Sequence, residues 1–125
     1  MKPEILPFAP ALPSHWQAIL RGEKSPIQSQ DAVLAWVELD LDADLRFNKS
    51  LLLLTEQLLL WTDGQHFESW AVSAEERLVH GDHAGVGHLR LELVNSLKRV
   101  WYFTLAVNPQ VLRLQSSFRK LTQDG

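Results

Sequence analysis

The chain has 125 residues, a length that suits one domain with a core of its own. Its formal net charge of −3 argues against a nucleic-acid-binding surface, which would show clustered Lys and Arg, and against docking on anionic lipid. Because it has no cysteine, neither a disulfide nor a thiolate zinc site can form within it.

The first ten residues, MKPEILPFAP, are interrupted by prolines and lack the apolar core of a signal peptide. No apolar run reaches the roughly 18 residues that would indicate a membrane span. Both features favour a cytoplasmic domain. Residues 14–22, SHWQAILRG, predict a short helix that Ser14 caps and Gly22 ends.

Strands are expected from residue 32 onward. Residues 32–42 alternate apolar and polar side chains, as a half-buried strand does. Two apolar runs then flank Thr55-Glu56-Gln57 within LLLLTEQLLLWTDG, and each predicts a strand buried on both faces. The Asp63-Gly64 pair supplies the positive φ that a hairpin turn needs. Further strands are expected over 66–73, 77–80, 88–94 and 99–107, with a charged connection over 42–50 and a loop over 81–87.

The last segment turns helical. Asn108 is predicted to cap a helix with Pro109 at its first position, and Val111, Leu114, Phe118 and Leu121 form one apolar stripe. The sequence therefore predicts a mainly β domain of about seven strands with one amphipathic C-terminal helix. We assign residues 1–125 to a single domain, with an N-terminal extension and short helix at 1–30, strands at 31–108 and a capping helix at 109–122.

This order resembles the pleckstrin-homology-like (PH-like) superfold, a barrel or strongly bent sheet of seven strands capped by a C-terminal helix. Its bacterial members often carry an apolar strand, a Thr with a polar residue, and a second apolar strand, as in LLLLTEQLLLW at 51–61. They also commonly open with a short helix before the first strand.

A narrower resemblance is to the N-terminal cytosolic domain of bacterial ABC exporters with fused permease and ATP-binding regions. It rests on four segments: PSHWQAIL (13–20), AWVELDLDADLRF (35–47), DHAGVGHLRL (82–91) and WYFTLAVNPQVLRL (101–114). The resemblance implies a non-catalytic interaction or regulatory domain on the cytoplasmic side of an inner-membrane transporter. The expected partners are other regions of the same transporter or the second protomer. The chain is then a fragment of a longer protein, whose GxxxxGK[ST] phosphate loop lies outside these residues.

The alternative function is a sensor module for a small or lipophilic molecule, which the aromatic surplus would suit. An enzyme is not predicted, because the sequence offers no GxSxG elbow and no evident acid–base pair. We accordingly assign no catalytic residue and no cofactor.

His80, His83 and His88 form the one metal-like cluster, HGDHAGVGH. Imidazoles suit Zn²⁺ or Ni²⁺, but the glycines at 81, 85 and 87 leave the cluster without fixed geometry. We therefore predict exposed turn histidines and no metal site. The glycines themselves predict a bend or bulge and not a phosphate cradle, since a strand and not a helix follows them.

Glu38, Asp40, Asp42 and Asp44 lie at alternate positions. With no glycine-pivoted loop to wrap around calcium, they predict a solvated strand edge. In the segment DLDADLRFNKS only Arg46 and Lys49 oppose three aspartates, so phosphoinositide binding is not expected. The five tryptophans are predicted to be mostly core.

Overall fold

The computed structural model describes residues 12–27 and 32–123. Its elements follow in the order α1 (Ser14–Leu20), β1 (Val33–Leu41), β2 (Phe47–Thr55), β3 (Leu58–Thr62), β4 (Phe67–Ala71), β5 (Glu76–His83), β6 (Val86–Leu93), β7 (Ser96–Thr104), the 3₁₀ turn η1 (Leu105–Val107) and α2 (Asn108–Gln123). The prediction of a mainly β chain with a short N-terminal helix and a C-terminal helix is confirmed.

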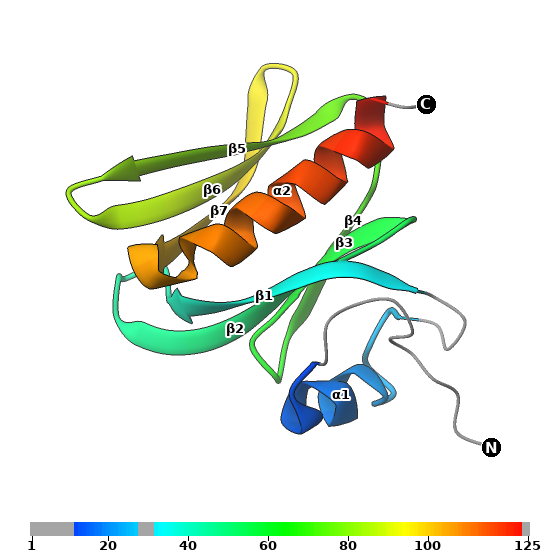
Figure 1. The fold of residues 1–125 in the computed structure, drawn as a ribbon. Coiled ribbons are helices and arrows are strands. Elements are labelled where there is room, and N and C mark those ends of the chain that lie inside the picture. The colour runs from blue at the N-terminus through cyan, green and yellow to red at the C-terminus, as the bar shows by residue number, and fades with distance from the viewer. Residues whose placement is uncertain (1–11, 28–31, 124–125) are drawn as a thin grey trace.

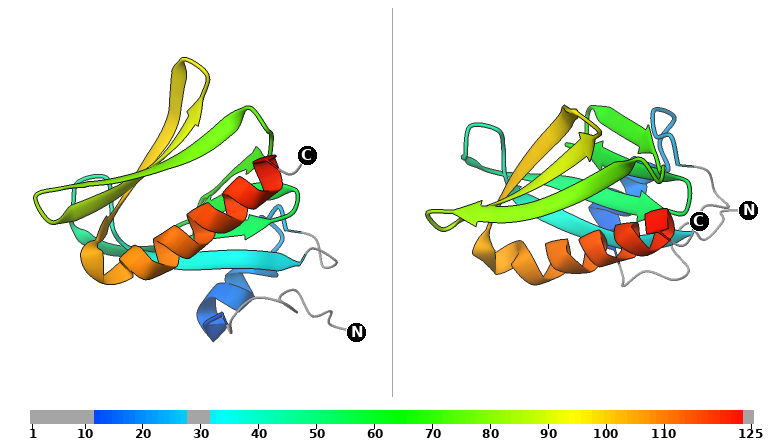
Figure 2. Two further views of the ribbon diagram at one scale, coloured as in Figure 1. Left: turned by 45° about the horizontal axis from the view of Figure 1, so that its top comes forward. Right: turned by 90° about the horizontal axis from the view of Figure 1, so that it is seen from above.

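The seven strands form two antiparallel sheets of consecutive strands, β1-β2-β3-β4 and β5-β6-β7. The expected architecture was a barrel or a strongly bent sheet. Among the residues described, the strands do not close into a barrel. Helix α2 contacts β1 and β2 of the first sheet and β5 of the second. It thus lies along the opening between the two sheets (Figures 1 and 2).

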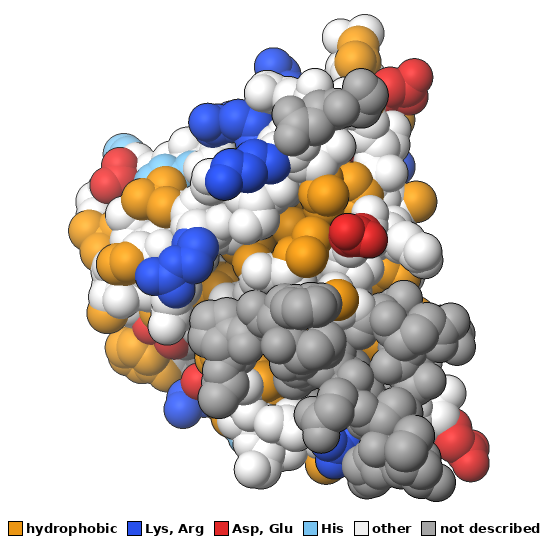
Figure 3. Space-filling model, turned by 45° about the vertical axis from the view of Figure 1, so that its right-hand side comes forward, with side chains coloured by type: hydrophobic (Ala, Val, Ile, Leu, Met, Phe, Trp, Pro, Cys, Tyr) orange, Lys and Arg blue, Asp and Glu red, His pale blue; other side chains and the backbone are white. Residues whose placement is uncertain are grey.

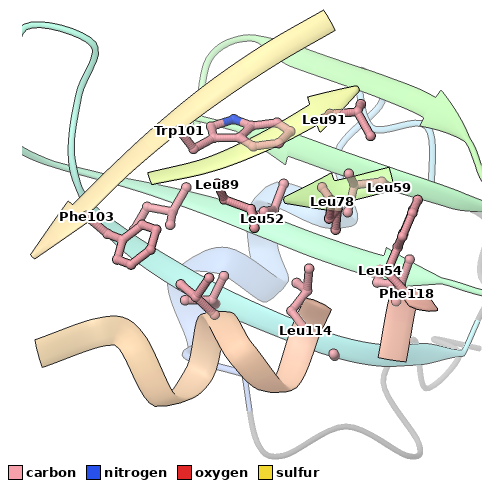
Figure 4. Close-up of a cluster of buried hydrophobic side chains, with 14 residues drawn as sticks. Leu52, Leu54, Leu59, Leu78, Leu89, Leu91, Trp101, Phe103, Leu114 and Phe118 are labelled. Carbon is pink, nitrogen blue, oxygen red and sulfur yellow. The ribbon is translucent and has the colours of Figure 1, made fainter. Parts of the chain in front are cut away.

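The main core fills the space between the two sheets and α2. Leu114 and Phe118 point from α2 toward leucines of both sheets (Figure 4), and both are at most 2% exposed. The ring of Phe103 and the indole of Trp101 close the core on the β7 side. The amphipathic stripe of the C-terminal helix therefore seals this core, as its spacing predicted.

The apolar run of β2 is buried on both faces, as predicted. Leu52 and Leu54 enter the main core, whereas Leu51 and Leu53 belong to a second cluster on the other face of the sheet. Helix α1 covers that second face through Trp16 and Leu20. The indole N–H of Trp16 donates to Oε2 of Glu38 at 2.8 Å, which links α1 to β1.

The prediction of a loop over 81–87 is wrong. Strands β5 and β6 continue through this segment and meet in a two-residue turn, Ala84-Gly85, with positive φ at both positions. Gly87 is a strand residue whose missing side chain leaves room for the Phe103 ring, because a Cβ there would meet that ring. Gly85 therefore permits the turn and Gly87 the close packing, and the β5–β6 ladder shows no bulge at either.

Several element boundaries also differ from the prediction. Strand β2 begins at Phe47, because the exposed residues 47–49 extend the β1–β2 ladder beyond the core. Strand β7 begins at Ser96 and ends at Thr104, where η1 leads directly into α2. The predicted caps do not form: Ser14 is the first helical residue of α1, and Asn108 is helical with its side chain bonded to His80.

The prediction of a solvated acidic edge is wrong for two of its four members. Besides the Trp16 contact of Glu38, both carboxylate oxygens of Asp40 accept hydrogen bonds from Thr104, from its N–H at 2.8 Å and its hydroxyl at 2.5 Å. Through these hydrogen bonds, Asp40 links β1 of the first sheet to the end of β7 in the second.

Candidate functional site

A groove runs between strand β5 and helix α2, which lie side by side in the views of Figures 1 and 2. Its volume is about 500 Å³. We call it the β5–α2 groove. It is lined by residues of β5, β6 and α2, namely Glu76, Arg77, Leu78, Val79, His80, Arg90, Glu92, Gln115, Phe118, Arg119, Thr122 and Gln123.

Strand β5 is an edge strand of its sheet, and its outer edge faces this groove. The side-chain amide of Gln115 donates to the backbone carbonyl of Leu78 at 2.8 Å, and the N–H of Glu76 donates to Ser73 and not to β6. Backbone direction alternates along an antiparallel strand, so residues 76, 78, 80 and 82 turn their polar backbone groups away from β6. No other strand pairs with this edge in the part of the chain that the structure describes, so its backbone is oriented as an added strand requires.

The opposite wall of the groove is one side of α2. Gln115, Arg119 and Thr122 are spaced by four and three residues and therefore share a helix face. Leu112, three residues before Gln115, is 42% exposed but lies outside the groove lining. The wall therefore presents hydrogen-bonding side chains to the groove.

The charges of the groove are unevenly paired. Arg90 lies 3.1 Å from Glu92, measured Nε to Oε2, and Lys98 reaches the buried Glu76 at 3.5 Å. Arg77 and Arg119 are exposed and have no ion-pair partner within the described ranges. Two free guanidinium groups therefore border a groove whose carboxylates already face cations.

The three candidate histidines do not converge. His80 pairs with Leu89 on the core-facing side of the sheet, and its Nε2 lies 2.6 Å from Oδ1 of Asn108. His83 and His88 lie on the other face, since they alternate with it in register. No group of three or more His, Cys, Asp or Glu side chains placed to hold a metal ion occurs in residues 12–27 and 32–123.

A second hollow of about 220 Å³ lies where the β1–β2 loop, β3 and β7 meet. We call it the tryptophan pocket, after Trp61 and Trp101 in its wall. The Arg99 guanidinium carbon lies 4.7 Å from the Trp61 ring centre and 5.5 Å from that of Trp101, and Arg99 Nε donates to Glu68 at 2.8 Å. Trp101 Nε1 is buried without a hydrogen-bond partner in this part of the chain.

Two aspartates at the rim of the tryptophan pocket shape its loops. Hydrogen bonds from the backbone N–H groups of Arg46 and Asp44 lower the pKa of Asp42 below its usual 3.8. For Asp63, burial opposes ionisation, but N–H donors from Gln65 and His66 and the His66 ring outweigh it and lower the pKa. Both carboxylates therefore stay ionised at neutral pH as structural acceptors.

The prediction of an exposed turn histidine is wrong for His80, which lies in β5, is partly buried and bonds to Asn108. Sequence reasoning also missed Arg77, Gln115 and Arg119 as groove residues. One signal was present: residues 108–123 contain three basic side chains and no acidic one in a chain of net negative charge. The five tryptophans behaved as predicted, because Trp16 and Trp101 are buried and the other three are partly buried.

Comparison of the chain with protein-family models, with curated proteins and with solved structures found no match. Across the described segments, no helix combines the length and apolar character needed to cross a membrane.

Proposed function

We propose that this chain is a non-catalytic, PH-like interaction domain that binds an extended protein segment in the β5–α2 groove. The observation that carries this proposal is the free edge of β5 beside α2. An extended segment added there would hydrogen-bond with the outward backbone groups of Leu78 and His80, while its side chains contact α2. The side-chain amide of Gln115 donates to the Leu78 carbonyl in the structure. This hydrogen bond would break, and an N–H group of the incoming segment would replace it.

The division into four and three consecutive strands, with a terminal helix along the opening, supports the PH-like assignment. The exporter assignment rests on the sequence resemblance alone. On that basis we propose that the domain regulates a bacterial ABC exporter from its cytoplasmic side. The segment in the groove then comes from another region of the transporter or from the second protomer.

A peptide selection tests the binding function. Twelve-residue peptides selected from a random display library should protect the amides of Leu78 and His80 from hydrogen exchange and leave that of Val79, already paired with β6, unchanged. N-methylation at every second residue of a selected peptide should abolish binding when it removes the N–H groups that face β5. It should leave binding unchanged when it removes the N–H groups that face away. Failure to select any binder, or protection confined to other strands, would reject the groove as the binding site.

The tryptophan pocket favours a second candidate function, the binding of a small aromatic or apolar molecule. Its wall combines indole rings with a stacked guanidinium, and aromatic side chains with a few polar groups are typical of small-molecule sites. A lipophilic ligand at one hundred times its Kd should stabilise the domain by about 2.7 kcal/mol and raise its melting temperature. A panel that gives no thermal shift and no change in tryptophan fluorescence would eliminate this candidate.

A further inference from the structure

The charge distribution around the β5–α2 groove indicates which kind of segment it accepts. The chain carries a net charge of −3, yet α2 carries Arg113, Arg119 and Lys120 with no acidic side chain. Lys and Arg side chains gather on the upper left of the face shown in Figure 3, while Asp and Glu side chains are scattered around it.

Two of these cations belong to opposite walls of the groove. Arg119 projects from α2 and Arg77 from β5, and both line the groove. Neither has an ion-pair partner in residues 12–27 or 32–123, whereas the groove carboxylates Glu76 and Glu92 each face a basic side chain. The unmatched charge of the groove is therefore positive.

We propose that the β5–α2 groove selects an acidic extended segment, in which Asp or Glu side chains contact Arg77 and Arg119. This inference rests on the proposed binding function and adds the chemistry of the partner. Guanidinium groups bind carboxylates through paired, charge-assisted hydrogen bonds. The backbone of the segment pairs with the edge of β5, and side chains at alternate positions point the same way, so residues i and i+2 of the segment can both be acidic.

Three pools of nine-residue peptides test the preference. All are randomised over Thr, Val, Ser and Gln, and two alternate central positions are fixed as Glu, as Gln or as Lys. The Glu pool should bind about fivefold tighter than the Gln pool at low salt, as expected for exposed charge pairs, and the Lys pool should bind most weakly. The advantage of the Glu pool should shrink as the ionic strength rises.

Two matched variants locate the effect. Arg119→Glu should abolish or reverse the preference for the Glu pool. Arg113→Glu makes the same change in charge on an exposed residue of α2, about 120° around the helix axis from Arg119 and outside the groove lining, and should leave the preference intact. Arg77→Gln should weaken the preference from the β5 side.

The outcomes separate the two proposals. If no pool binds, the groove function fails and the acidic preference fails with it. If the Glu and Gln pools bind equally, or if Arg113→Glu acts as strongly as Arg119→Glu, the groove function stands and the acidic preference is overturned.

Discussion

Gly85 and Gly87 lie two residues apart in the β5–β6 hairpin, but they are glycines for different physical reasons. A Cβ at Gly87 would lie 2.2 Å from the Phe103 ring, whereas a Cβ at Gly85 would meet nothing within 4 Å. Gly85 instead has a φ of +83°, which L side chains rarely adopt. Gly87 is therefore constrained by packing and Gly85 by backbone conformation.

Substitution by alanine should separate these two constraints. Gly87→Ala should lower the free energy of unfolding by about 3 kcal/mol, because Phe103 is fully buried and has no room to retreat. Gly85→Ala should cost about 1 kcal/mol through backbone strain alone. Urea unfolding monitored by tryptophan fluorescence measures both. Equal losses would contradict the packing role assigned to Gly87.

At the scale of elements, the turn between β3 and β4 depends on an ionised aspartate. Asp63 accepts the N–H groups of Gln65 and His66 at 2.9 and 2.8 Å, and its pKa is lowered. A lowered pKa in the folded state contributes stability that is present above the unfolded value of 3.8 and is lost as pH falls through the folded value.

Asp63→Asn keeps the acceptor oxygen but removes the charge. The variant should melt at a lower temperature than the wild type at pH 7, and the two should converge as the pH falls through the lowered pKa of Asp63 and its carboxyl group becomes protonated. Asp44→Asn is the control, since the Asp44 side chain accepts no hydrogen bond in the described part of the chain. A difference in melting temperature that persists at low pH would mean that charge is not the cause.

At the scale of the whole molecule, the first sheet is covered on both faces, by α2 on one and by α1 on the other. Trp16 of α1 is 3% exposed and packs in the second cluster with Leu51, Leu53 and Leu60. Trp16→Ala should lower the free energy of unfolding by about 3 kcal/mol or more and expose this leucine face. The exposed Ala18→Ser is the matched control. Calorimetry with dye binding reports both effects, and an unchanged melting temperature would show that α1 is not part of the folded core.

Helix α2 seals the other side of the molecule. A chain ending at Val107 loses Val111, Leu114 and Phe118, which are 0%, 0% and 2% exposed. Losing three buried side chains of this size exceeds the stability of most domains of this length, so the truncated chain should not fold cooperatively. Circular dichroism during thermal unfolding measures this. A cooperative transition at the temperature of the full chain would contradict the sealing role.

The sequence by itself determined the elements, because their signals are local. The alternation over 32–42 predicted β1, the leucine runs at 51–54 and 58–61 predicted strands buried on both faces, and the spacing of Val111, Leu114 and Phe118 predicted α2. Hydrophobic periodicity depends only on neighbours a few residues apart, so it can be read without a fold. The main failure, the loop assigned to 81–87, arose because glycine in a strand and glycine in a loop look alike until the partner ring of Phe103 is in place.

Only the tertiary structure decided the β5–α2 groove and the pairing of its charges. Leu78 and Gln115 are 37 residues apart in sequence, and their hydrogen bond follows from how α2 returns along β5. The same holds for Asp40 and Thr104, 64 residues apart, which fasten the two sheets together. Which carboxylates are paired and which arginines are left free depends on distances between segments remote in sequence, and no local pattern encodes those distances.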